Sequence, residues 1–273
     1  MNILITGATG YIGKHLISEI IKLNCKIFIL SRKKNIFLKK KKNLIFYKGS
    51  LEKPPKKIFK EKFDILLHLA WDNLDDYQSK KHFKTLNIHK KFINKMMRCE
   101  LKKIIVTGTC AEYGLKDGKL YEKYNVNPVS NYAIAKNDLR TYIKKIIHNK
   151  KIILNWIRVF HLFGGKEPKK TIIGQIKYAI RNKKKLFKMS SGEQSKDYTS
   201  IYILIKLITS LIIKDFNYEV INCCSGKPIK IIKLVKKYTN YKKIKIIRNY
   251  YPVRNNEPFK SYGSNYIINK ILN

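Results

Sequence analysis

The sequence is poor in acidic residues and rich in basic ones. Its 273 residues include 18 Asp and Glu against 59 Lys and Arg, which gives a formal net charge of +41. Such a charge is typical of proteins that bind nucleic acid or an anionic membrane surface. Here the basic residues are spread along the whole chain among many isoleucines and asparagines, and no nucleic-acid motif accompanies them. We therefore expect neither nucleic acid nor a membrane as partner, although the positive potential would attract anionic small molecules.

Cysteines and long apolar segments are also scarce. The five cysteines are Cys25, Cys99, Cys110, Cys223 and Cys224. They show neither metal-ligand spacing nor a disulfide framework, so we predict no metal site and a reducing, cytoplasmic environment. An apolar strand begins at residue 2, which leaves no space for a signal peptide. The apolar segment 201–213 is too short to span a bilayer and contains Lys206, so it predicts a buried helix.

What the sequence does contain is a glycine-rich turn near its N-terminus. Residues 2–6 form a short apolar run and residues 12–23 carry apolar side chains at helical spacing, so the glycines lie in a strand-to-helix turn. The first glycine permits a tight reversal, the second lets backbone approach a pyrophosphate, and the third lets the helix pack closely on the strand. Free N–H groups at the helix start favour the phosphates. The dinucleotide-binding residues assigned here are Gly7, Thr9, Gly10, Tyr11, Ile12 and Gly13.

The end of the next strand bears on which dinucleotide is bound. The apolar residues 27–30 are followed by Ser31 and Arg32. Folds that select NAD usually place an acidic side chain here, which accepts from the ribose 2′-hydroxyl, and this segment has none. A hydroxyl followed by a guanidinium suits a 2′-phosphate, which arginine can bind through two hydrogen bonds. We expect NADP(H), with NAD(H) as the alternative if Arg32 is only a solvated cation.

Length and patterning predict an α/β protein with a doubly wound parallel Rossmann sheet. Strand-like and helix-like segments alternate through Arg158, as in such a sheet. A chain of this length suits one dinucleotide-binding domain and a smaller lobe. We expect the NADP(H)-binding domain over residues 1–160, with residues 161–273 forming mainly a substrate-binding lobe that is partly interleaved with it. The predicted strands cover residues 2–6, 26–31, 44–47, 64–69, 103–109 and 152–158.

Tyr132 and Lys136 form the most informative pair. They lie four residues apart in an amphipathic segment and therefore share one face of a helix. A nearby ammonium, together with an oxidised nicotinamide, favours phenolate and lowers the tyrosine pKa from about 10 toward neutral pH. The pair predicts a site in which Tyr132 is general acid to a ketone oxygen during hydride transfer, and general base in reverse. The same spacing is also common on solvent-facing helices.

Several motifs together give the chain a family resemblance. Besides the glycine turn and Tyr132-x-x-x-Lys136, they are the segments 64–70, 107–114 and 196–198. In this order they resemble the extended short-chain dehydrogenase/reductases, in particular the NAD(P)-dependent epimerase/dehydratase group that acts on nucleotide-activated sugars. The resemblance covers nearly the whole chain. It implies that Thr109 bonds the reacting oxygen and that Lys136 also bonds the nicotinamide ribose. The further cofactor contacts that it implies are Leu69, Ala70 and Phe160.

The resemblance also implies substrate contacts and a quaternary structure. His161 stands where many relatives have a substrate-binding asparagine; it is either a donor to the substrate or a cap for local backbone. Arg254 falls where relatives place an arginine that binds the pyrophosphate, and Lys196 replaces a family arginine, keeping its charge without its fork. The predicted substrate residues are Thr109, Cys110, Tyr132, His161, Tyr198 and Arg254. Family habit predicts a homodimer built from helices near residues 80–98 and 132–148.

One departure from the family pattern narrows the reaction. Nucleotide-sugar 4,6-dehydratases of this group carry acidic residues directly after the catalytic threonine, where this chain has Cys110 and Ala111. Alanine cannot move a proton, and Glu112 would point to the opposite side of an extended segment, so dehydration is disfavoured. Cys110 is either a base for epimerisation or a small side chain in the turn after a strand.

Two reactions remain, 4-keto reduction and 4-epimerisation. Segments 68–71 and 222–228 look like those of 4-keto-6-deoxyhexose reductases, which exchange NADP(H), whereas epimerases retain NAD. We therefore expect an NADPH-dependent reductase of a 4-keto-6-deoxyhexose linked to dTDP, or else to CDP or GDP, that makes deoxysugars for surface glycans. The alternative is an NAD-retaining nucleotide-sugar 4-epimerase or epimerase-reductase. A non-catalytic cofactor sensor is a third hypothesis, in which Tyr132, Lys136 and Thr109 would have no task.

Overall fold

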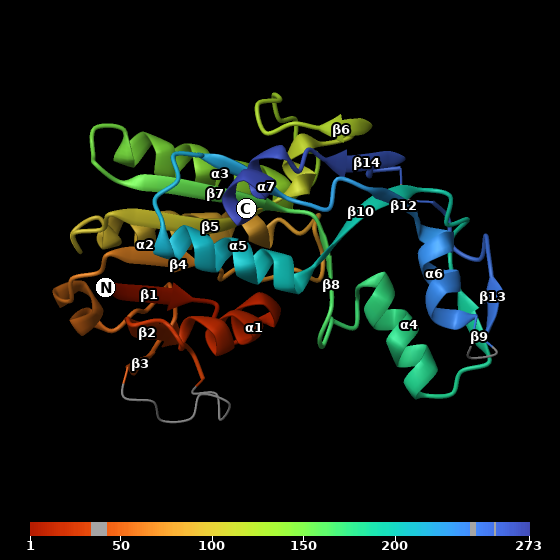
Figure 1. Ribbon diagram of the computed structural model, residues 1–273, viewed down its shortest axis with the longest axis horizontal. Coiled ribbons are helices and arrows are strands. Elements are labelled where there is room, and N and C mark those ends of the chain that lie inside the picture. The colour runs from red at the N-terminus through yellow and green to blue at the C-terminus, as the bar shows by residue number, and fades with distance from the viewer. Residues whose placement is uncertain (34–42, 241–243, 254) are drawn as a thin grey trace.

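A seven-stranded parallel sheet forms the centre of the protein (Figure 1). The computed structural model describes residues 1–33, 43–240, 244–253 and 255–273. The strand order is β11-β7-β5-β4-β1-β2-β3. The strands are β1 (Asn2–Thr6), β2 (Lys26–Ser31), β3 (Leu44–Lys48), β4 (Ile65–His68), β5 (Lys103–Thr109), β7 (Ile153–Val159) and β11 (Val220–Cys223). The predicted doubly wound parallel sheet is thus confirmed, and each of the six predicted strands is found to within one residue.

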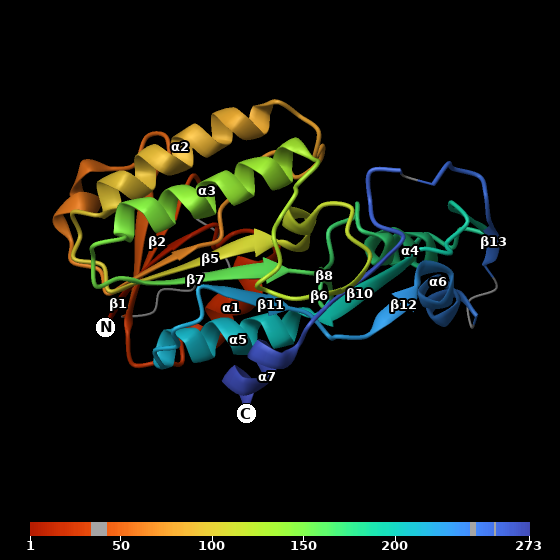
Figure 2. The ribbon, with the colours of Figure 1, turned by 90° about the horizontal axis from the view of Figure 1, so that it is seen from above.

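Helices cover both faces of this sheet, as the two views show (Figures 1 and 2). One face packs against α1 (Tyr11–Ile20), α5 (Ile201–Ile213) and α7 (Tyr266–Leu272). The other packs against α2 (Lys81–Met96) and α3 (Asn131–Ile147), while the short helix η1 (Lys56–Lys60) lies between β3 and β4 in the chain. Because side chains alternate along a strand, Ile3 and Ile5 face the first layer and Leu4 faces the second. Strands buried on both faces explain the nearly continuous apolar runs of the sequence.

Part of the chain beyond residue 161 returns to this sheet. β11 pairs with β7 in parallel, with Val220 opposite Trp156, and α5 and α7 complete one of its layers. Strand β11 was not among the predicted strands, because four residues within a segment assigned to the lobe give too short a pattern. Helix α5 confirms the predicted buried helix: it has 13 residues and contributes Leu204, Leu207 and Leu211 to the core. The described residues include no helix that is both apolar enough and long enough to cross a bilayer.

The remaining elements, most of them from the C-terminal part of the chain, form a smaller lobe. Its mixed sheet has the order β12-β10-β14-β6, with β8 also paired to β10. These strands are β6 (Gly118–Leu120), β8 (His161–Phe163), β10 (Ser195–Ser200), β12 (Pro228–Lys230) and β14 (Lys260–Gly263). A separate apolar cluster of the lobe joins two further helices to a two-stranded ribbon. These elements are α4 (Ile172–Arg181), α6 (Ile231–Thr239), β9 (Leu186–Lys188) and β13 (Lys245–Ile247).

Candidate active site

The glycine turn forms a cradle at the carboxyl end of β1. Gly7 has a φ of +74°, and a Cβ there would lie 2.6 Å from the backbone nitrogen of Ala70. A Cβ on Gly13 would lie 2.4 Å from the Gly7 carbonyl oxygen. The first glycine is therefore required by the reversal and the third by close packing of α1. Leu69 follows β4 and donates its N–H to the Thr6 carbonyl over 3.1 Å, so two predicted cofactor segments lie side by side.

The N-terminus of α1 fits the pyrophosphate of a dinucleotide. Gly10 is the N-cap and brings no side chain to the end of the helix, and among the described residues no acidic side chain occupies the first turn. The free N–H groups of this turn, which includes Ile12, remain available to an anion. Thr9 lies in the turn just before them, and the Tyr11 hydroxyl donates to the Gly164 carbonyl over 2.7 Å, which ties α1 to the loop after β8.

An acidic side chain from another part of the chain, Asp72, lies at the end of β2, where the local sequence has none. The Ser31 hydroxyl donates to the Lys33 carbonyl over 3.1 Å, and Arg32 forms an ion pair with Asp72, with 3.1 Å between Nη2 and Oδ1. Both side chains of the pair are largely exposed. Asp72 follows β4, so the fold supplies from another strand the carboxylate that the segment after β2 lacks. Local sequence could not show this, because 40 residues separate the two partners.

Tyr132 and Thr109 come together at the carboxyl end of β5. Ser130 caps α3 by accepting from the Ala133 N–H over 3.2 Å, which places Tyr132 in the first turn. The Tyr132 ring stacks on Tyr77, with 4.9 Å between the ring centroids, and its side chain is buried. Thr109 ends β5, and its side chain acts on the phenol by opposing the rise in the Tyr132 pKa.

Lys136 lies one turn further along α3 and is 2% exposed. Its Nζ donates to the Thr107 carbonyl over 2.7 Å and lies 4.2 Å from the centroid of the Trp71 ring. The helix thus carries Tyr132 and Lys136 to the same end of β5, as their spacing predicted. Trp71 was noted in the sequence as part of a motif, but its contact with Lys136 was not foreseen.

Burial sets the protonation of both groups. It raises the pKa of Tyr132 well above its ordinary value; Tyr77 and Glu112 add to the rise, and the Thr109 side chain opposes it. The protein's own groups therefore act against the expected lowering, and the phenol holds its proton. Burial lowers the pKa of Lys136 to about 7, opposed by the Glu112 carboxylate. A protonated phenol is the form needed to donate to a ketone oxygen.

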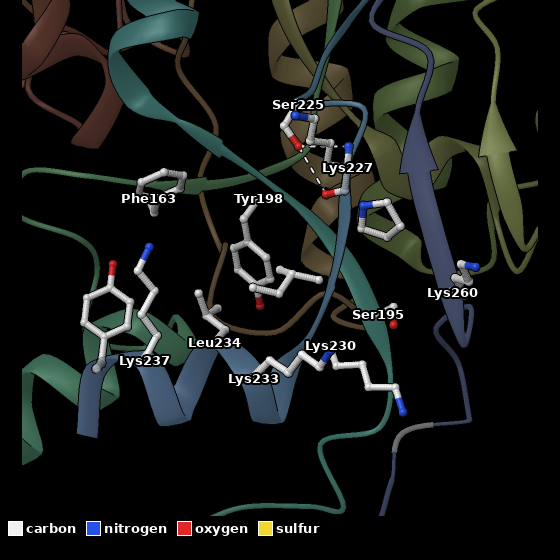
Figure 3. A pocket seen from close by; sticks show the side chains of 13 residues that line it. Phe163, Ser195, Tyr198, Ser225, Lys227, Lys230, Lys233, Leu234, Lys237 and Lys260 are labelled. Atoms are coloured by element: carbon white, nitrogen blue, oxygen red, sulfur yellow. Dashed lines mark hydrogen bonds between the residues drawn. The ribbon is translucent and has the colours of Figure 1, made fainter. Parts of the chain in front are cut away.

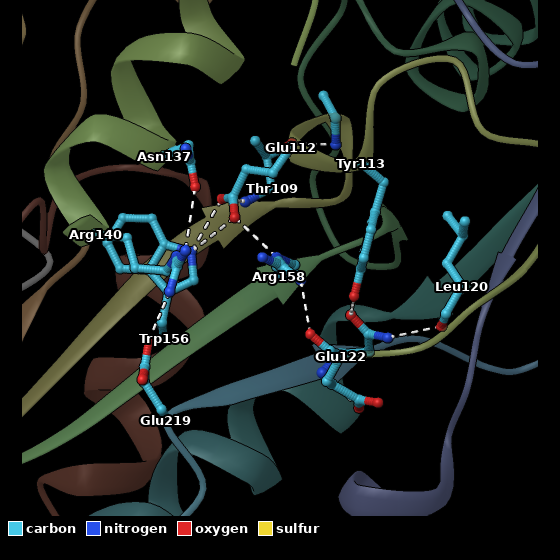
Figure 4. Close-up of polar contacts among 12 residues, drawn as sticks. Thr109, Glu112, Tyr113, Leu120, Glu122, Asn137, Arg140, Trp156, Arg158 and Glu219 are labelled. Carbon is cyan, nitrogen blue, oxygen red and sulfur yellow. Dashed lines mark hydrogen bonds and ion pairs between the residues drawn. The ribbon is translucent and has the colours of Figure 1, made fainter. Parts of the chain in front are cut away.

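Glu112 is held inside the protein by a network that the sequence did not reveal (Figure 4). Residues Cys110–Tyr113 form the helix η2, so the segment is not extended as expected. The Glu112 Oε1 accepts from the Thr109 N–H and the Trp156 Nε1, both over 2.9 Å. Its Oε2 accepts from Arg158 Nε over 2.8 Å. The carboxylate is fully buried and anchors the backbone of Thr109, so it does not serve as a mobile proton carrier.

Cys110, the first residue of η2, is half-buried. Burial raises the pKa of its thiol to about 12, while the Lys196 ammonium acts in the opposite direction. A thiol in this state is almost entirely protonated at neutral pH. This favours the interpretation of Cys110 as a small side chain over its interpretation as a base.

His161 and Tyr198 are neighbours on adjacent strands. They are paired across β8 and β10, with 5.4 Å between their ring centroids. The His161 residue as a whole is exposed. Desolvation of its ring by the surrounding protein lowers the pKa of the imidazole, and the Lys196 ammonium lowers it further. Lys196 is 3% exposed; its Nζ donates to the Pro258 carbonyl over 2.7 Å and lies 3.3 Å from the Glu257 carboxylate. The structure therefore brings together two predicted substrate residues and a buried cation.

Two other predicted residues lie elsewhere. Phe160 is 4% exposed and packs in a separate cluster with Tyr113, Leu120 and Cys224. Its predicted cofactor contact would have to come from its backbone. Arg254, the predicted pyrophosphate ligand, falls outside the described residues.

A cavity of about 610 Å³ opens in the lobe between α6, β8, β10 and β12 (Figure 3). Five ammonium groups and three aromatic rings contribute to its wall, and Tyr198 is shared with the predicted substrate residues. The basic and aromatic residues that line it are Lys227, Lys230, Lys233, Lys237, Lys260, Phe163, Tyr198 and Tyr238. Such a lining suits an anionic ligand.

A glycine cradle, a helix N-terminus and a Tyr-Lys-Thr set on a Rossmann sheet define a nicotinamide-dependent enzyme class, and comparison with known proteins agrees. The model of the NAD dependent epimerase/dehydratase family matches residues 3–224. The chain belongs to this family and is an enzyme of the nucleotide-sugar-modifying kind.

Individual relatives are consistent with this assignment. The dTDP-6-deoxy-L-talose 4-dehydrogenase (NAD(+)) of Aggregatibacter actinomycetemcomitans is 28% identical over 272 residues, covering 97% of this chain and 100% of that protein. The uncharacterized UDP-glucose epimerase YtcB of Bacillus subtilis strain 168 is 25% identical over 86% of this chain and 80% of its own. The UDP-glucuronic acid 4-epimerase of Bacillus cereus, solved with UDP-glucuronic acid and NAD, has the same fold. Its TM-score is 0.89 at 19% identity, covering 100% of this chain and 93% of that one.

Proposed function

We propose that this protein interconverts the 4-keto and 4-hydroxy forms of a nucleotide-linked 6-deoxyhexose, acting as a 4-ketoreductase. The observation that carries the proposal is the meeting of Tyr132, Thr109 and Lys136 at the end of β5. They lie beside a Glu112 carboxylate that is paired with the Arg158 guanidinium. This set can move a proton at one oxygen, whereas Glu112, the acid that follows Thr109 in the chain, is held by three donors and is not free for the carbon acid-base chemistry of dehydration. The relative named as a talose 4-dehydrogenase carries out the same type of reaction in the opposite direction.

Each residue has a distinct task in this proposal. A bound nicotinamide supplies the hydride. Tyr132 donates its proton to the sugar oxygen, and Thr109 holds that oxygen through its hydroxyl. Lys136, fixed on the Thr107 carbonyl, supplies positive charge next to the phenol and a donor for the nicotinamide ribose. Its charge favours the phenolate left after proton transfer.

For the cofactor we now favour NAD(H) over the NADP(H) expected from Ser31 and Arg32. The Arg32 guanidinium is paired with Asp72, and that carboxylate suits a ribose 2′-hydroxyl better than a 2′-phosphate. The talose 4-dehydrogenase relative is also named for NAD(+). NADP(H) remains the alternative, which requires Arg32 to leave Asp72.

For the substrate we propose a dTDP-linked sugar, by analogy with the same relative. The lysine-lined cavity and the buried Lys196 support an anionic substrate. CDP- and GDP-linked sugars, a role in surface-glycan synthesis, a cytoplasmic location and a homodimer stay predictions from the sequence.

An NAD-retaining 4-epimerase is the second candidate, favoured by the relative named as an epimerase. An epimerase must keep its nicotinamide through the catalytic cycle. Absorbance at 340 nm after borohydride treatment of extensively dialysed protein would support it, and protein free of nicotinamide would support the reductase.

The direct experiment follows NADH or NADPH oxidation with dTDP-4-keto-6-deoxy sugars, and NAD⁺ reduction with dTDP-6-deoxy-L-talose. Tyr132→Phe removes the general acid and is expected to lower kcat by about 10²- to 10⁴-fold, with cofactor binding retained. Tyr142→Phe, on the same helix α3 and half-buried, is the matched control and should keep its activity. Full turnover by Tyr132→Phe would overturn the proposal.

A further inference from the structure

The geometry points to Trp71 as the positioning residue of Lys136. We propose that the face of its indole holds the ammonium in place and keeps it charged, and that His82 fixes the indole. The inference rests on the proposed function of Lys136, but part of its test requires no turnover.

The ammonium of Lys136 has a defined set of partners. It lies 4.2 Å from the Trp71 ring centroid and donates to the Thr107 carbonyl over 2.7 Å. An ammonium carries three N–H donors. The carbonyl accepts one and the indole face attracts a second, which leaves a third for a ligand. Loss of the indole face would let the flexible side chain of Lys136 rotate about the remaining bond.

Trp71 is itself fixed through its N–H. The indole Nε1 donates to His82 Nδ1 over 3.1 Å, and His82 Nε2 lies 2.9 Å from the Asp76 carbonyl. Because Nδ1 accepts, the ring proton of neutral His82 must lie on Nε2, where it is donated to that carbonyl. His82 is fully buried in the first turn of α2. The Tyr132 ring packs edge to face against the indole, with 6.0 Å between the ring centroids, so the indole contacts side chains of both α2 and α3.

The groups facing Lys136 explain why an aromatic face matters there. Burial favours the neutral amine, and the Glu112 carboxylate of η2 opposes this. His68 on β4 and His89 on α2 also face the ammonium; burial lowers the pKa of His68 to about 3 and that of His89 well below its ordinary value. Both imidazoles are therefore neutral near pH 7. Trp71 adds a desolvated cation–π contact, which stabilises the charged amine.

The kinetic test compares Trp71→Leu with Trp71→Phe. If activity requires the cationic lysine, it falls as pH rises through the Lys136 pKa. Trp71→Leu should move this descending limb of the pH–activity profile about one pH unit lower, and should reduce kcat about tenfold with little change in KM. Trp71→Phe keeps a ring face, so its values should lie between those of the wild type and Trp71→Leu. His82→Gln keeps an acceptor for the indole and removes the imidazole. It should therefore keep the limb, whereas loss of the limb would assign it to His82 and overturn the inference.

A second test uses the intrinsic fluorescence of Trp71 without substrate or cofactor. The chain has two tryptophans, Trp71 and Trp156, so the difference between wild type and Trp71→Phe reports on Trp71. We expect this difference to titrate with a midpoint near the Lys136 pKa of about 7, and the titration to vanish in Lys136→Met. Persistence in Lys136→Met, or an unmoved kinetic limb in Trp71→Leu, would overturn the inference. A normal titration with full activity in Tyr132→Phe would instead overturn the proposed function.

Discussion

The Glu112 carboxylate and the Arg158 guanidinium form a buried ion pair, with 2.8 Å between Oε2 and Nε and side chains 0% and 2% exposed. The same carboxylate also accepts from the Thr109 N–H. An acid close to Thr109, the proposed catalytic threonine, is thereby held by three donors that leave it no substrate-facing role. The pair connects β7 to η2 and fixes the residue that is proposed to hold the reacting oxygen.

This pair predicts a large difference between two matched substitutions. Glu112→Gln leaves the buried Arg158 charge uncompensated and should lower the free energy of unfolding by about 3 kcal/mol or more. Glu19→Gln removes a carboxylate from the exposed pair of Glu19 with Lys22 and should cost less than about 1 kcal/mol. Urea unfolding of both variants measures the two values. Equal losses would mean that the buried pair does not hold η2 in place.

Cys110 should be chemically inert and dispensable for redox turnover. Burial raises the pKa of its thiol to about 12, so the thiolate fraction at pH 7.5 is about 10³-fold below that of an ordinary cysteine. Alkylation by iodoacetamide, followed by mass spectrometry of the Cys110 peptide, should be correspondingly slow. Cys110→Ala should retain most reductase activity. Rapid labelling, or a Cys110→Ala variant that loses a measured epimerase activity, would restore the interpretation of Cys110 as a base.

Lys136 should make stability depend on pH. Its pKa is about 7 in the folded protein, against an ordinary value of 10.5. Between these values the unfolded chain binds a proton that the folded chain does not, so stability rises with pH over this window. Relative to Lys136→Met, the wild type should gain on the order of 1–3 kcal/mol in unfolding free energy from pH 7 to pH 9. Urea unfolding at both pH values tests this, and parallel changes in the two proteins would contradict it.

The Arg32–Asp72 pair predicts a shift in cofactor preference. Asp72→Asn frees the Arg32 guanidinium and removes a negative charge near the expected 2′ position, so the ratio of kcat/KM for NADPH over NADH should rise about two- to fivefold. Asp75→Asn is the matched control, because Asp75 is also exposed but pairs with Lys170. Its ratio should stay as in the wild type. A ratio unchanged in Asp72→Asn would show that Asp72 does not decide the preference.

The fold could be predicted largely from the sequence because its signals are local. Apolar runs of four to seven residues between helical periods define β1, β4 and β5, and the glycine turn fixes where the first helix begins. The spacing of Tyr132 and Lys136 is likewise a property of one helix. What could not be predicted depends on contacts between distant segments. Examples are Asp72 beside Arg32, Arg158 on Glu112, and Trp71 under Lys136.

The pKa of Tyr132 shows the same limit. The sequence reveals a lysine one turn away, which lowers a phenol pKa, but it does not reveal how deeply both groups are buried. Burial acts on each group separately: it raises the pKa of the tyrosine and lowers the pKa of the lysine. Protonation at this site is thus a property of packing as much as of neighbouring charges.

The return of β11, α5 and α7 to the main sheet makes the two parts of the chain inseparable. A fragment ending at residue 160 would leave the β7 edge unpaired and would expose the apolar surface beside α1 that α5 and α7 cover. Such a truncated piece should aggregate rather than fold, so residues 1–160 are not a transferable module. Swapping lobes between relatives to alter sugar choice would have to exchange loops within 161–200 and 224–265, leaving the interwoven segments intact.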